Sequence, residues 1–356
     1  MEVSSILINW YNQNKRQLPW RNASDPYIVW VSEIILQQTR VDQGLEYFNR
    51  FVTRFPDIFS LACASEQEVL KHWQGLGYYS RARNMQVAAQ TIVREFNGNF
   101  PQSSAELLKL KGIGPYTASA IASICFGEAS PVVDGNVMRV IARYFGITVA
   151  VNSPEGHKAV YEAALLILDK THAGTFNQAI MEFGALHCTP RKPMCESCPL
   201  QAGCEAFHAK TVDVLPVKIK LTRPRDRHFH YLAILQMNED GHQEIFLHKR
   251  TGKDIWKGMY ELPLIESPSA MEPEELFGSS GWKTIFGEQQ LQIMEYSDEY
   301  KHQLTHQTIH ARFVSIQIEE CPHGSAGWQR IEVRHIPDFP IPRLIDRYLK
   351  QKKVIL

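Results

Sequence analysis

Residues 107–123 read LLKLKGIGPYTASAIAS and decide the fold of the N-terminal part of the chain. A helix-forming run leads into a tight turn that contains Gly112 and Gly114, and a second apolar helix follows. Glycine permits a left-handed turn and lets the backbone approach a partner closely. The unpaired amides at the start of the second helix would then point at phosphate oxygens. The stretch therefore predicts a phosphate-binding helical hairpin, although an ordinary corner between two helices would also use such glycines.

Helical periodicity extends to both sides of this hairpin. Apolar residues recur at spacings of three and four in the stretches 28–38, 45–51, 69–73, 85–93 and 159–168. Ser103 and Glu106 form a capping-box pattern at the start of the hairpin. We predict an all-α region over residues 1–210, with the hairpin at about 105–123.

The pattern changes after residue 210. Residues 211–228 combine basic residues with prolines, as in an extended linker. The stretches 230–237 and 244–249 are typical of strands and are joined across Asn238–Gly241, which predicts a hairpin. A further strand is expected at 311–318 and a last helix at 341–350. We predict a smaller α/β domain over residues 229–356.

Length and charge restrict the possible classes. The 356 residues accommodate two or three domains, and the formal net charge is zero. Residues 1–220 hold 21 Lys and Arg against 19 Asp and Glu, so any DNA binding must depend on local patches and backbone amides. The N-terminus lacks the features of a signal peptide, and the most apolar stretch, 159–168, is too short to span a bilayer. We expect a cytoplasmic protein with no membrane partner.

Four of the seven cysteines lie close together in the sequence. They are Cys188, Cys195, Cys198 and Cys204. In a reducing compartment this density indicates a metal centre and not a set of disulfides. Four thiolates suit zinc and an iron–sulfur cluster equally well, so the spacing leaves that choice open. The remaining Cys63, Cys125 and Cys321 are isolated, and we expect them to be small buried hydrophobic residues.

Two carboxylates occupy distinctive positions. Glu33 is the only charged residue at the start of an apolar helix, an environment that would raise its pKa. Asp134 lies in Val133-Asp134-Gly135-Asn136, directly after the second helix of the hairpin. Without further information, Glu33 is explained as a paired helix residue and Asp134 as a helix N-cap.

Taken together, these motifs resemble the MutY-type glycosylases of the helix-hairpin-helix superfamily, which includes endonuclease III. The hairpin pattern, the cysteine spacing, WVSEIILQQT (residues 30–39) and VDGNV (residues 133–137) carry the resemblance. WKGMYELP (residues 256–263) is similar, more weakly, to an element of Nudix folds, but the Nudix catalytic box is missing. The resemblance implies an all-α glycosylase domain with a [4Fe–4S] loop at 188–204, followed by an α/β Nudix-like domain without pyrophosphatase activity.

The family resemblance also implies the reaction, which is hydrolytic removal of adenine mispaired with 8-oxoguanine or guanine. The transition state of such a cleavage is oxocarbenium-like, and adenine leaves poorly unless it is protonated. Glu33 would protonate adenine and position water, and Asp134 would stabilise the developing cation. Tyr116 stands where bifunctional relatives carry a lysine nucleophile, so we expect hydrolysis without a Schiff base.

Further residues are implied to contact DNA. The loop Leu76-Gly77-Tyr78 would wedge between bases, and Leu304-Thr305-His306 would read the opposite base. The family usually has Phe-Ser-His at the latter position, so the hydroxyl is retained and the aromatic ring is lost. The other implied contacts are Trp20, Arg21, Gln38, Thr39, Gly112, Gly114, Asn136 and Glu182. The expected partner is double-stranded DNA with an A:8-oxoguanine or A:G mispair, bound by a monomer that is nucleoid-associated if bacterial.

Three alternatives remain at this point. An endonuclease III-like lyase would need lysine at position 116 and normally lacks a domain after the cysteines. A thymine-specific mismatch glycosylase would not need Glu33. A non-catalytic iron–sulfur DNA-binding module would not need the pair Glu33 and Asp134.

Overall fold

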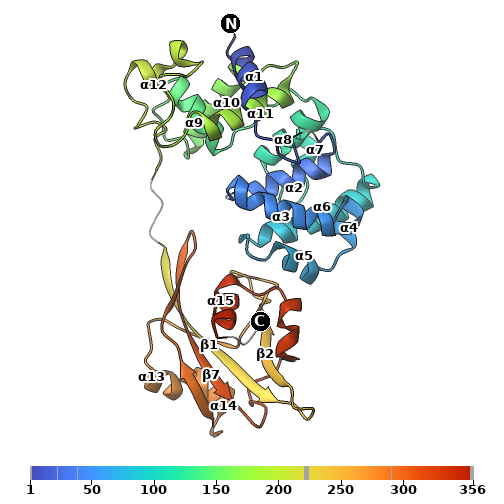
Figure 1. The fold of residues 1–356 in the computed structure, drawn as a ribbon, viewed down its shortest axis with the longest axis vertical. Helices are drawn as coiled ribbons and strands as arrows, with labels where there is room; N and C mark the ends of the chain where they lie inside the picture. Colours follow the sequence, from blue (N-terminus) through green and yellow to red (C-terminus); the bar gives the residue numbers. More distant parts are fainter. Residues whose placement is uncertain (1, 22, 38, 220–223, 290, 353–356) are drawn as a thin grey trace. The chain divides into compact units, whose positions relative to one another are not determined.

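The computed structural model describes residues 2–21, 23–37, 39–219, 224–289 and 291–352. The chain forms two compact units, whose helices and strands are labelled in Figure 1. The first unit comprises residues 1–63 and 84–220, and the second comprises residues 64–83 and 221–356.

The first unit is helical and has no strand among its described residues. Its elements are α1 (Val3–Asn14), α2 (Pro26–Leu36), α3 (Val41–Arg54), α4 (Ile58–Cys63), α6 (Ser80–Phe96, from Asn84 onward), α7 (Ser104–Leu107), α8 (Pro115–Phe126), α9 (Gly135–Tyr144), α10 (Pro154–Ile167), α11 (Ala173–Leu186), the 3₁₀ turn η1 (Gln201–Gly203) and α12 (Glu205–His208). The helices expected from periodicity in this unit are therefore confirmed.

Side chains at the helix starts explain where several helices begin. Asp25 Oδ1 accepts the Tyr27 amide at 2.9 Å, and Pro26 occupies the first position of α2, where no amide partner is needed. The Ser103 hydroxyl accepts the Glu106 amide at 3.3 Å, so the predicted cap of α7 is present. These caps fix the start of α2, which carries Glu33, and the entry into the hairpin.

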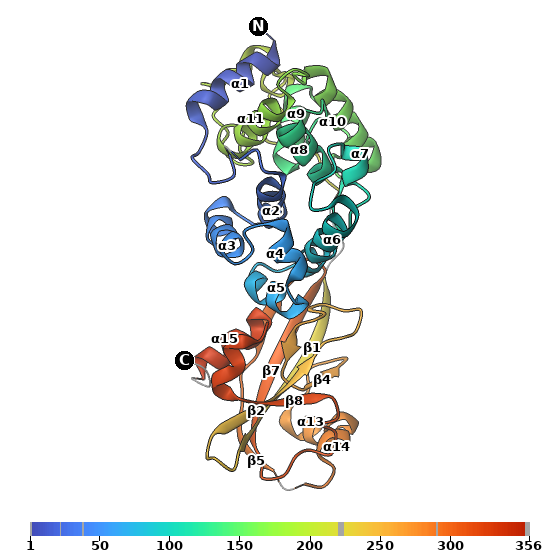
Figure 2. The ribbon, with the colours of Figure 1, turned by 90° about the vertical axis from the view of Figure 1, so that its right-hand side faces the viewer.

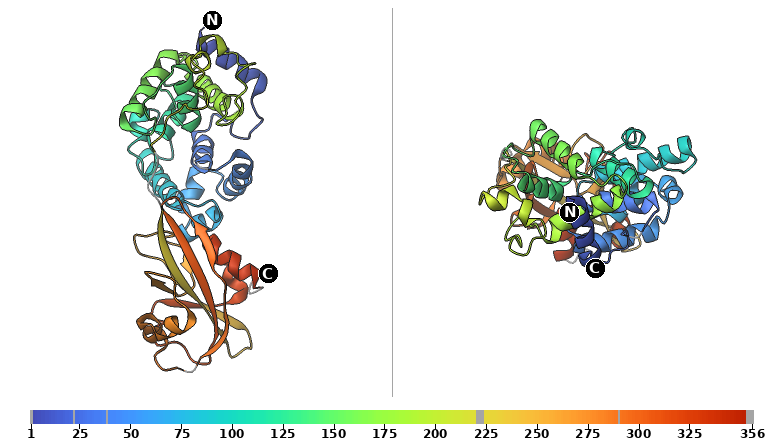
Figure 3. Two further views of the ribbon diagram at one scale, coloured as in Figure 1. Left: turned by 90° about the vertical axis from the view of Figure 1, so that its left-hand side faces the viewer. Right: turned by 90° about the horizontal axis from the view of Figure 1, so that it is seen from above.

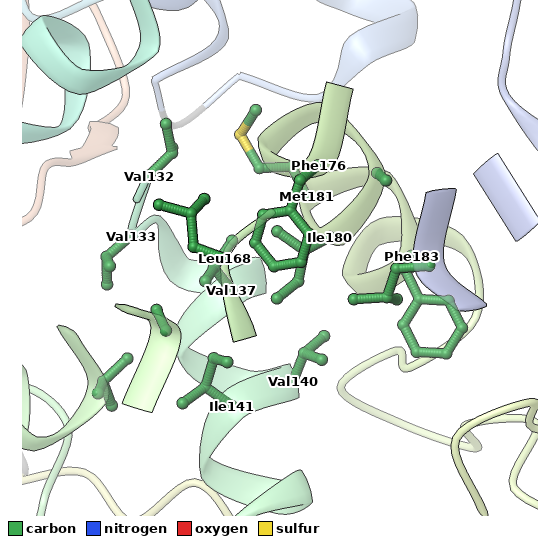
Figure 4. Packing of buried hydrophobic residues seen from close by; sticks show 14 of the residues in the cluster. Val132, Val133, Val137, Val140, Ile141, Leu168, Phe176, Ile180, Met181 and Phe183 are labelled. Carbon is green, nitrogen blue, oxygen red and sulfur yellow. The ribbon is translucent and has the colours of Figure 1, made fainter. Parts of the chain in front are cut away.

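One hydrophobic core cluster of the first unit lies between α1, α9, α10 and α11. Val137, Val140 and Ile141 of α9 pack against Phe176 and other apolar residues of α11, as Figure 4 shows. The first residues of α9 and the middle of α11 are therefore held side by side. This packing positions the polar groups at the start of α9 and along α11.

The second unit is built around one sheet. Its elements are α5 (Glu66–Trp73), β1 (Arg225–Met237), β2 (Gln243–Lys249), β3 (Tyr260–Glu261), β4 (Leu264–Ser267), α13 (Pro273–Gly278), α14 (Ser280–Phe286), β5 (Gln292–Tyr296), β6 (Tyr300–Gln303), β7 (Gln307–Gln317), β8 (Trp328–Glu332), the 3₁₀ helix η2 (Val333–Asp338) and α15 (Arg343–Gln351). The main strand order is β3-β2-β1-β7-β5, and β1 and β7 run parallel. The predicted hairpin is confirmed, because β1 and β2 pair antiparallel on both sides of residues 238–242.

Helices cover both faces of this sheet. Val314 and Ile316 of β7 pack with Trp282 and Phe286 of α14. Phe313, which points to the opposite face, stacks on Tyr348 of α15, with ring centroids 3.9 Å apart. Figure 2 and Figure 3 show α15 on one side of β1 and β7, and Figure 2 labels α13 and α14 on the other. The alternation of side chains along β7 therefore decides which helix each residue contacts.

The segment expected to be a linker is held by hydrogen bonds where the structure describes it. The Val217 carbonyl accepts the Val151 amide at 3.0 Å, and the Ile219 amide donates to Asn152 Oδ1 at 2.8 Å. At the other end, β1 already begins at Arg225. Residues 211–219 are thus bound to the first unit, although their sequence has the composition of a linker.

The isolated cysteines differ from the prediction. Cys63 and Cys321 are exposed and Cys125 is half-buried, so the expectation that all three are buried is wrong. A lone apolar-type residue can lie at the surface without large cost, because one cysteine side chain buries little area. Across the described residues, no helix combines the length and apolar character required to cross a membrane.

Candidate active site and cysteine cluster

Glu33 lies on α2 in a buried position, with 8% of its surface exposed. Tyr116, at the start of α8, donates its hydroxyl hydrogen to Glu33 Oε2, and the other carboxylate oxygen has no hydrogen-bond partner among the described residues. Burial raises the pKa of Glu33. The Tyr116 hydrogen bond and the charge of Arg21 offset this rise only in part. The rise expected from the apolar surroundings in the sequence is therefore confirmed.

Asp134 is the N-cap of α9. Its Oδ1 accepts the amides of Asn136 and Val137 at 2.9 and 2.7 Å, and its Oδ2 accepts the Asn136 side-chain amide at 2.8 Å. Burial nevertheless raises the pKa of Asp134 above its ordinary value. The negative charge of Asp134 in turn contributes to the raised pKa of Glu33, so the two carboxylates belong to one electrostatic site.

A third acid, Glu182 on α11, is buried and hydrogen-bonded to two arginines. Its Oε1 accepts the backbone amide and Nε of Arg16 at 3.0 and 2.8 Å, and its Oε2 accepts Arg16 Nη2 at 2.7 Å and Arg21 Nη2 at 2.5 Å. Burial alone would raise the pKa of Glu182, but the two guanidinium groups lower it overall. Gln178 completes this group by accepting from Tyr11 at 2.8 Å and from Arg21 at 3.3 Å. Arg21 therefore connects Glu182 to the neighbourhood of Glu33.

The remaining pocket residues of the first unit are less directly connected. Trp20 is buried and packs edge-on against Phe48, with centroids 4.8 Å apart. Thr39 is half-buried, and its amide donates to the Leu36 carbonyl at 3.3 Å. Gln38 lies outside the described residues. Within the described part of the chain, neither Trp20 nor Thr39 is hydrogen-bonded to the group around Glu33.

The hairpin has two glycines with different environments. Gly112 is left-handed, with φ +79°, and a Cβ atom there would lie 2.5 Å from the Cβ of Asn84. Gly114 has φ −93°, caps α8, and has open space around the position of a Cβ. The expectation that both glycines serve a left-handed turn is therefore corrected, since only Gly112 does. The α8 start has no side-chain cap, which leaves its first amides available to an outside acceptor.

Two further candidate residues meet within the second unit. Tyr78 follows the left-handed Gly77, has a positive φ of 48°, and is 47% exposed. Its hydroxyl is hydrogen-bonded to the Thr305 hydroxyl at the tip of the β6–β7 hairpin. His306 is exposed, and its carbonyl accepts the Arg225 amide at 3.0 Å. Leu76 is half-buried, and its amide donates to the Trp73 carbonyl at 3.2 Å.

All seven cysteines are free thiols, and four of them gather after α11. Burial is the largest cause that raises the pKa of Cys195, and the charges of Cys188 and Cys204 raise it further. Short turns connect the four, such as the Cys198 amide donating to the Cys195 carbonyl at 3.1 Å. Among the described residues, no three His, Cys, Asp or Glu side chains surround a point in the manner of ligands of a single ion. The donor set, four cysteine sulfurs in one loop, nonetheless fits a thiolate-bound metal centre.

Arg139 of α9 connects the Asp134 region to this cysteine loop. Its Nη2 donates to Asn136 Oδ1 at 3.0 Å and to the Gly184 carbonyl at 2.5 Å, and its Nε donates to the Cys188 carbonyl at 2.7 Å. Asn136 in turn holds Asp134. Arg139, Arg16 and Gln178 were not predicted from the sequence, because each has partners more than 40 residues away along the chain. The four-residue spacing of Arg139 and Arg143 on a buried helix was a signal that could have been used.

Comparison with known families agrees with this architecture. A model of the HhH-GPD superfamily of base excision DNA repair proteins matches residues 31–163, and a NUDIX domain model matches residues 232–351. A solved thermostable thymine-DNA glycosylase is 29% identical with a TM-score of 0.53, and the match covers 58% of this chain and 95% of that chain. The fold and the site thus define a helix-hairpin-helix DNA glycosylase followed by a Nudix-like domain, and the expected fold class is confirmed.

Curated relatives identify the family more closely. The adenine DNA glycosylase of Buchnera aphidicola subsp. Baizongia pistaciae is 33% identical over 88% of this chain and 86% of the relative. The adenine DNA glycosylase of Buchnera aphidicola subsp. Schizaphis graminum is 38% identical over 73% of this chain and 74% of the relative. The chain belongs to the adenine DNA glycosylase family. It is a base-excision-repair hydrolase that acts on DNA and cleaves the N-glycosidic bond of adenine.

Proposed function

We propose that the enzyme removes adenine paired with 8-oxoguanine or guanine, with Glu33 as the acid and Asp134 as the stabiliser of the developing cation. The hydrogen bond from Tyr116 to Glu33 carries this proposal. It fixes one carboxylate oxygen of a buried acid whose pKa is raised, and it leaves the other oxygen available to a substrate. A raised pKa favours the protonated form of Glu33, and that form can donate its proton to a ring nitrogen of adenine.

Asp134 suits the second role because its negative charge is held in one place. Three hydrogen bonds from the start of α9 orient its carboxylate. A fixed carboxylate beside C1′ stabilises an oxocarbenium-like transition state without having to reorganise. Loss of Glu33's proton to adenine leaves a carboxylate that can then accept a proton from the attacking water.

Adenine recognition is assigned to Glu182, Arg21 and Trp20. Glu182 is a buried acid whose pKa is lowered, and its hydrogen bond to Arg21 holds that guanidinium at the proposed nucleotide pocket. We further propose that Gly112, Gly114 and Asn136 contribute to DNA binding and that Thr39 and Gln38 lie near the opposite base, as the family resemblance implies.

Hydrolysis without a Schiff base is proposed because Tyr116 occupies the position of the lysine nucleophile. Burial and the nearby Glu33 raise the pKa of Tyr116 well above its ordinary value, so the phenol remains a neutral donor. Lys111, the nearest lysine of the hairpin, is exposed and is not part of the hydrogen-bonded group at Glu33.

We propose that the opposite base is read by Tyr78, Thr305 and His306, with Leu76 and Gly77 shaping the wedge. The hydrogen bond between Tyr78 and Thr305 supports this assignment, because it joins the wedge loop to the hairpin tip within one unit. The hydroxyl of Thr305 can donate a hydrogen bond to N7 or accept one from it, and the base edge at N7 distinguishes 8-oxoguanine from guanine.

We propose that Cys188, Cys195, Cys198 and Cys204 hold a [4Fe–4S] cluster. When bound, the cluster supplies structural cross-linking of the loop 188–204 and redox chemistry, and the four cysteines would be its ligands. We also propose that the protein acts as a monomer in the cytoplasm, where the chromosomal DNA of a bacterium is found.

A single-turnover glycosylase assay tests this proposal. Duplexes with A opposite 8-oxoguanine, A opposite G and T opposite G are incubated with enzyme, and alkali then reveals abasic sites. We expect product from the first two duplexes only, no cleavage without alkali, and a visible absorption band of an iron–sulfur cluster. No alkali-labile product with A opposite 8-oxoguanine would refute the substrate assignment. A stoichiometric protein–DNA adduct trapped by borohydride would refute the hydrolytic route, because such an adduct needs a lysine amine that forms a Schiff base.

A further inference from the structure

The side chain of Arg143 on α9 is buried next to the cysteines, with 3% of its surface exposed. Its Nη1 donates to Cys188 Sγ at 3.4 Å and to the Thr189 carbonyl at 2.8 Å. Its Nη2 donates to the Pro190 carbonyl at 3.4 Å. One edge of the guanidinium therefore faces the first cysteine and the two residues that follow it.

The opposite edge of Arg143 faces the segment that leaves the cysteine loop. Nε donates to the carbonyls of Val212 and Leu215, both at 3.0 Å, and Leu215 is itself buried. Beyond this point the segment is held by Asn152, whose side chain pairs with the amide and carbonyl of Ile219. Arg143 is thus shared between the cysteine loop and residues 211–219.

The hydrogen-bond partners of Arg143 leave open how its positive charge is balanced. Its acceptors are four backbone carbonyls and one sulfur, and no carboxylate among the described residues pairs with it. Arg16 and Arg21, by contrast, share the carboxylate of Glu182. A buried cation is costly, and an anionic group in contact with it lowers that cost. The sulfur of Cys188 is the group in contact that can carry a negative charge.

We propose that Arg143 is a positioning residue that acts as the buried counter-charge of the cysteine cluster and couples the cluster to the docking of residues 211–219. The inference rests on the proposed [4Fe–4S] centre, because four thiolates around such a centre are anionic. A cation and a hydrogen bond at one ligand sulfur raise the reduction potential of the centre and protect it from oxidation. Loss of the centre would leave the charge of Arg143 uncompensated and weaken its hold on Val212 and Leu215.

The experiment compares the full-length wild-type protein with Arg143→Met, Arg143→Lys and Arg191→Met. Arg191 is an exposed cation inside the same cysteine loop, so its variant controls for charge acting through solvent. Three quantities are measured: the rate of iron release to a chelator in air, the midpoint potential by voltammetry, and the rate of proteolysis within residues 211–219. Far-UV circular dichroism reports whether each variant is folded.

We expect Arg143→Met to release iron at least ~10-fold faster than wild type, with a more negative midpoint potential and faster cleavage of residues 211–219. Arg143→Lys keeps the charge but loses the forked geometry, so its potential should stay closer to wild type while the segment is still cleaved faster. Arg191→Met should match wild type in all three measurements.

The outcomes separate this inference from the proposed cofactor. A wild-type protein that contains no iron overturns the [4Fe–4S] proposal and this inference with it. Iron-loaded wild type together with Arg143 variants of unchanged potential and release rate overturns the inference alone. If Arg143→Met does not fold, Arg143→Lys is the deciding variant. Proteolysis and iron release at wild-type rates in Arg143→Lys would contradict the coupling.

Discussion

Replacing Gly112 and Gly114 separately by alanine should change two different properties. The first substitution should lower the stability of the fold, and the second should weaken DNA binding. At Gly112, alanine must adopt φ +79°, which costs about 1–2 kcal/mol for a residue with a Cβ atom. The new Cβ would also lie 2.5 Å from the Asn84 Cβ, and such overpacking typically costs about 1–3 kcal/mol. The sum of about 2–5 kcal/mol corresponds to a fall in melting temperature of roughly 4–20 °C for a unit of this size.

At Gly114 the same substitution meets open space and an ordinary backbone conformation. Alanine is a poorer N-cap than glycine by at most about 1 kcal/mol, so the melting temperature should change little. The methyl group would instead stand where a phosphate oxygen is expected to approach the first amides of α8. Losing one hydrogen bond to a charged acceptor costs about 1.5–3 kcal/mol, or roughly a 10- to 100-fold rise in Kd.

The two variants are compared by thermal unfolding and by fluorescence anisotropy on an A:8-oxoguanine duplex, in a Glu33→Gln background that prevents turnover. We expect Gly112→Ala to lower stability and Gly114→Ala to lower affinity at nearly unchanged stability. Wild-type melting of Gly112→Ala would refute the steric argument. Wild-type affinity of Gly114→Ala would refute the assignment of the α8 start as a phosphate contact.

Three further predictions concern charges and the recognition loop. Burial raises the pKa of Glu33 in the folded state, so folding favours its protonated form, and this stabilisation is lost as pH rises through the folded pKa. Glu33→Gln should therefore melt at a higher temperature than wild type at pH 8 but not at pH 4. Its single-turnover rate should fall at least ~100-fold. Glu182→Gln leaves the charge of Arg21 uncompensated, which lowers the pKa of Glu33. The loss of rate on the alkaline side of the pH profile should therefore begin at a lower pH than in wild type. An unchanged pH profile would contradict this coupling. Thr305→Val removes the hydroxyl that is hydrogen-bonded to Tyr78. This variant should reduce the preference for 8-oxoguanine over guanine without changing the melting temperature. Tyr78→Phe, which removes the same hydrogen bond from its other partner, is the control.

Sequence reasoning succeeded where a local pattern is sufficient. The apolar residues around Glu33 predicted a buried acid with a raised pKa, and the glycine-rich turn predicted the hairpin. It failed where exposure depends on distant elements. Cys63 and Cys321 lie at the surface, although isolated cysteines were expected to be buried. Short strands such as β3, with two residues, contain too few positions to show an alternating pattern.

By itself the sequence determined the helical hairpin, the grouping of four cysteines and the change from helices to strands. These features depend on spacing within about 20 residues, which backbone geometry converts directly into local structure. Only the tertiary structure decided that Arg16 and Arg21 share Glu182, and that Arg143 joins Cys188 to residues 212–215. Those contacts connect positions 45 to 166 residues apart along the chain. Their partners are set by how helices pack against one another, because a long cationic side chain can reach many acceptors and only the packed core selects among them.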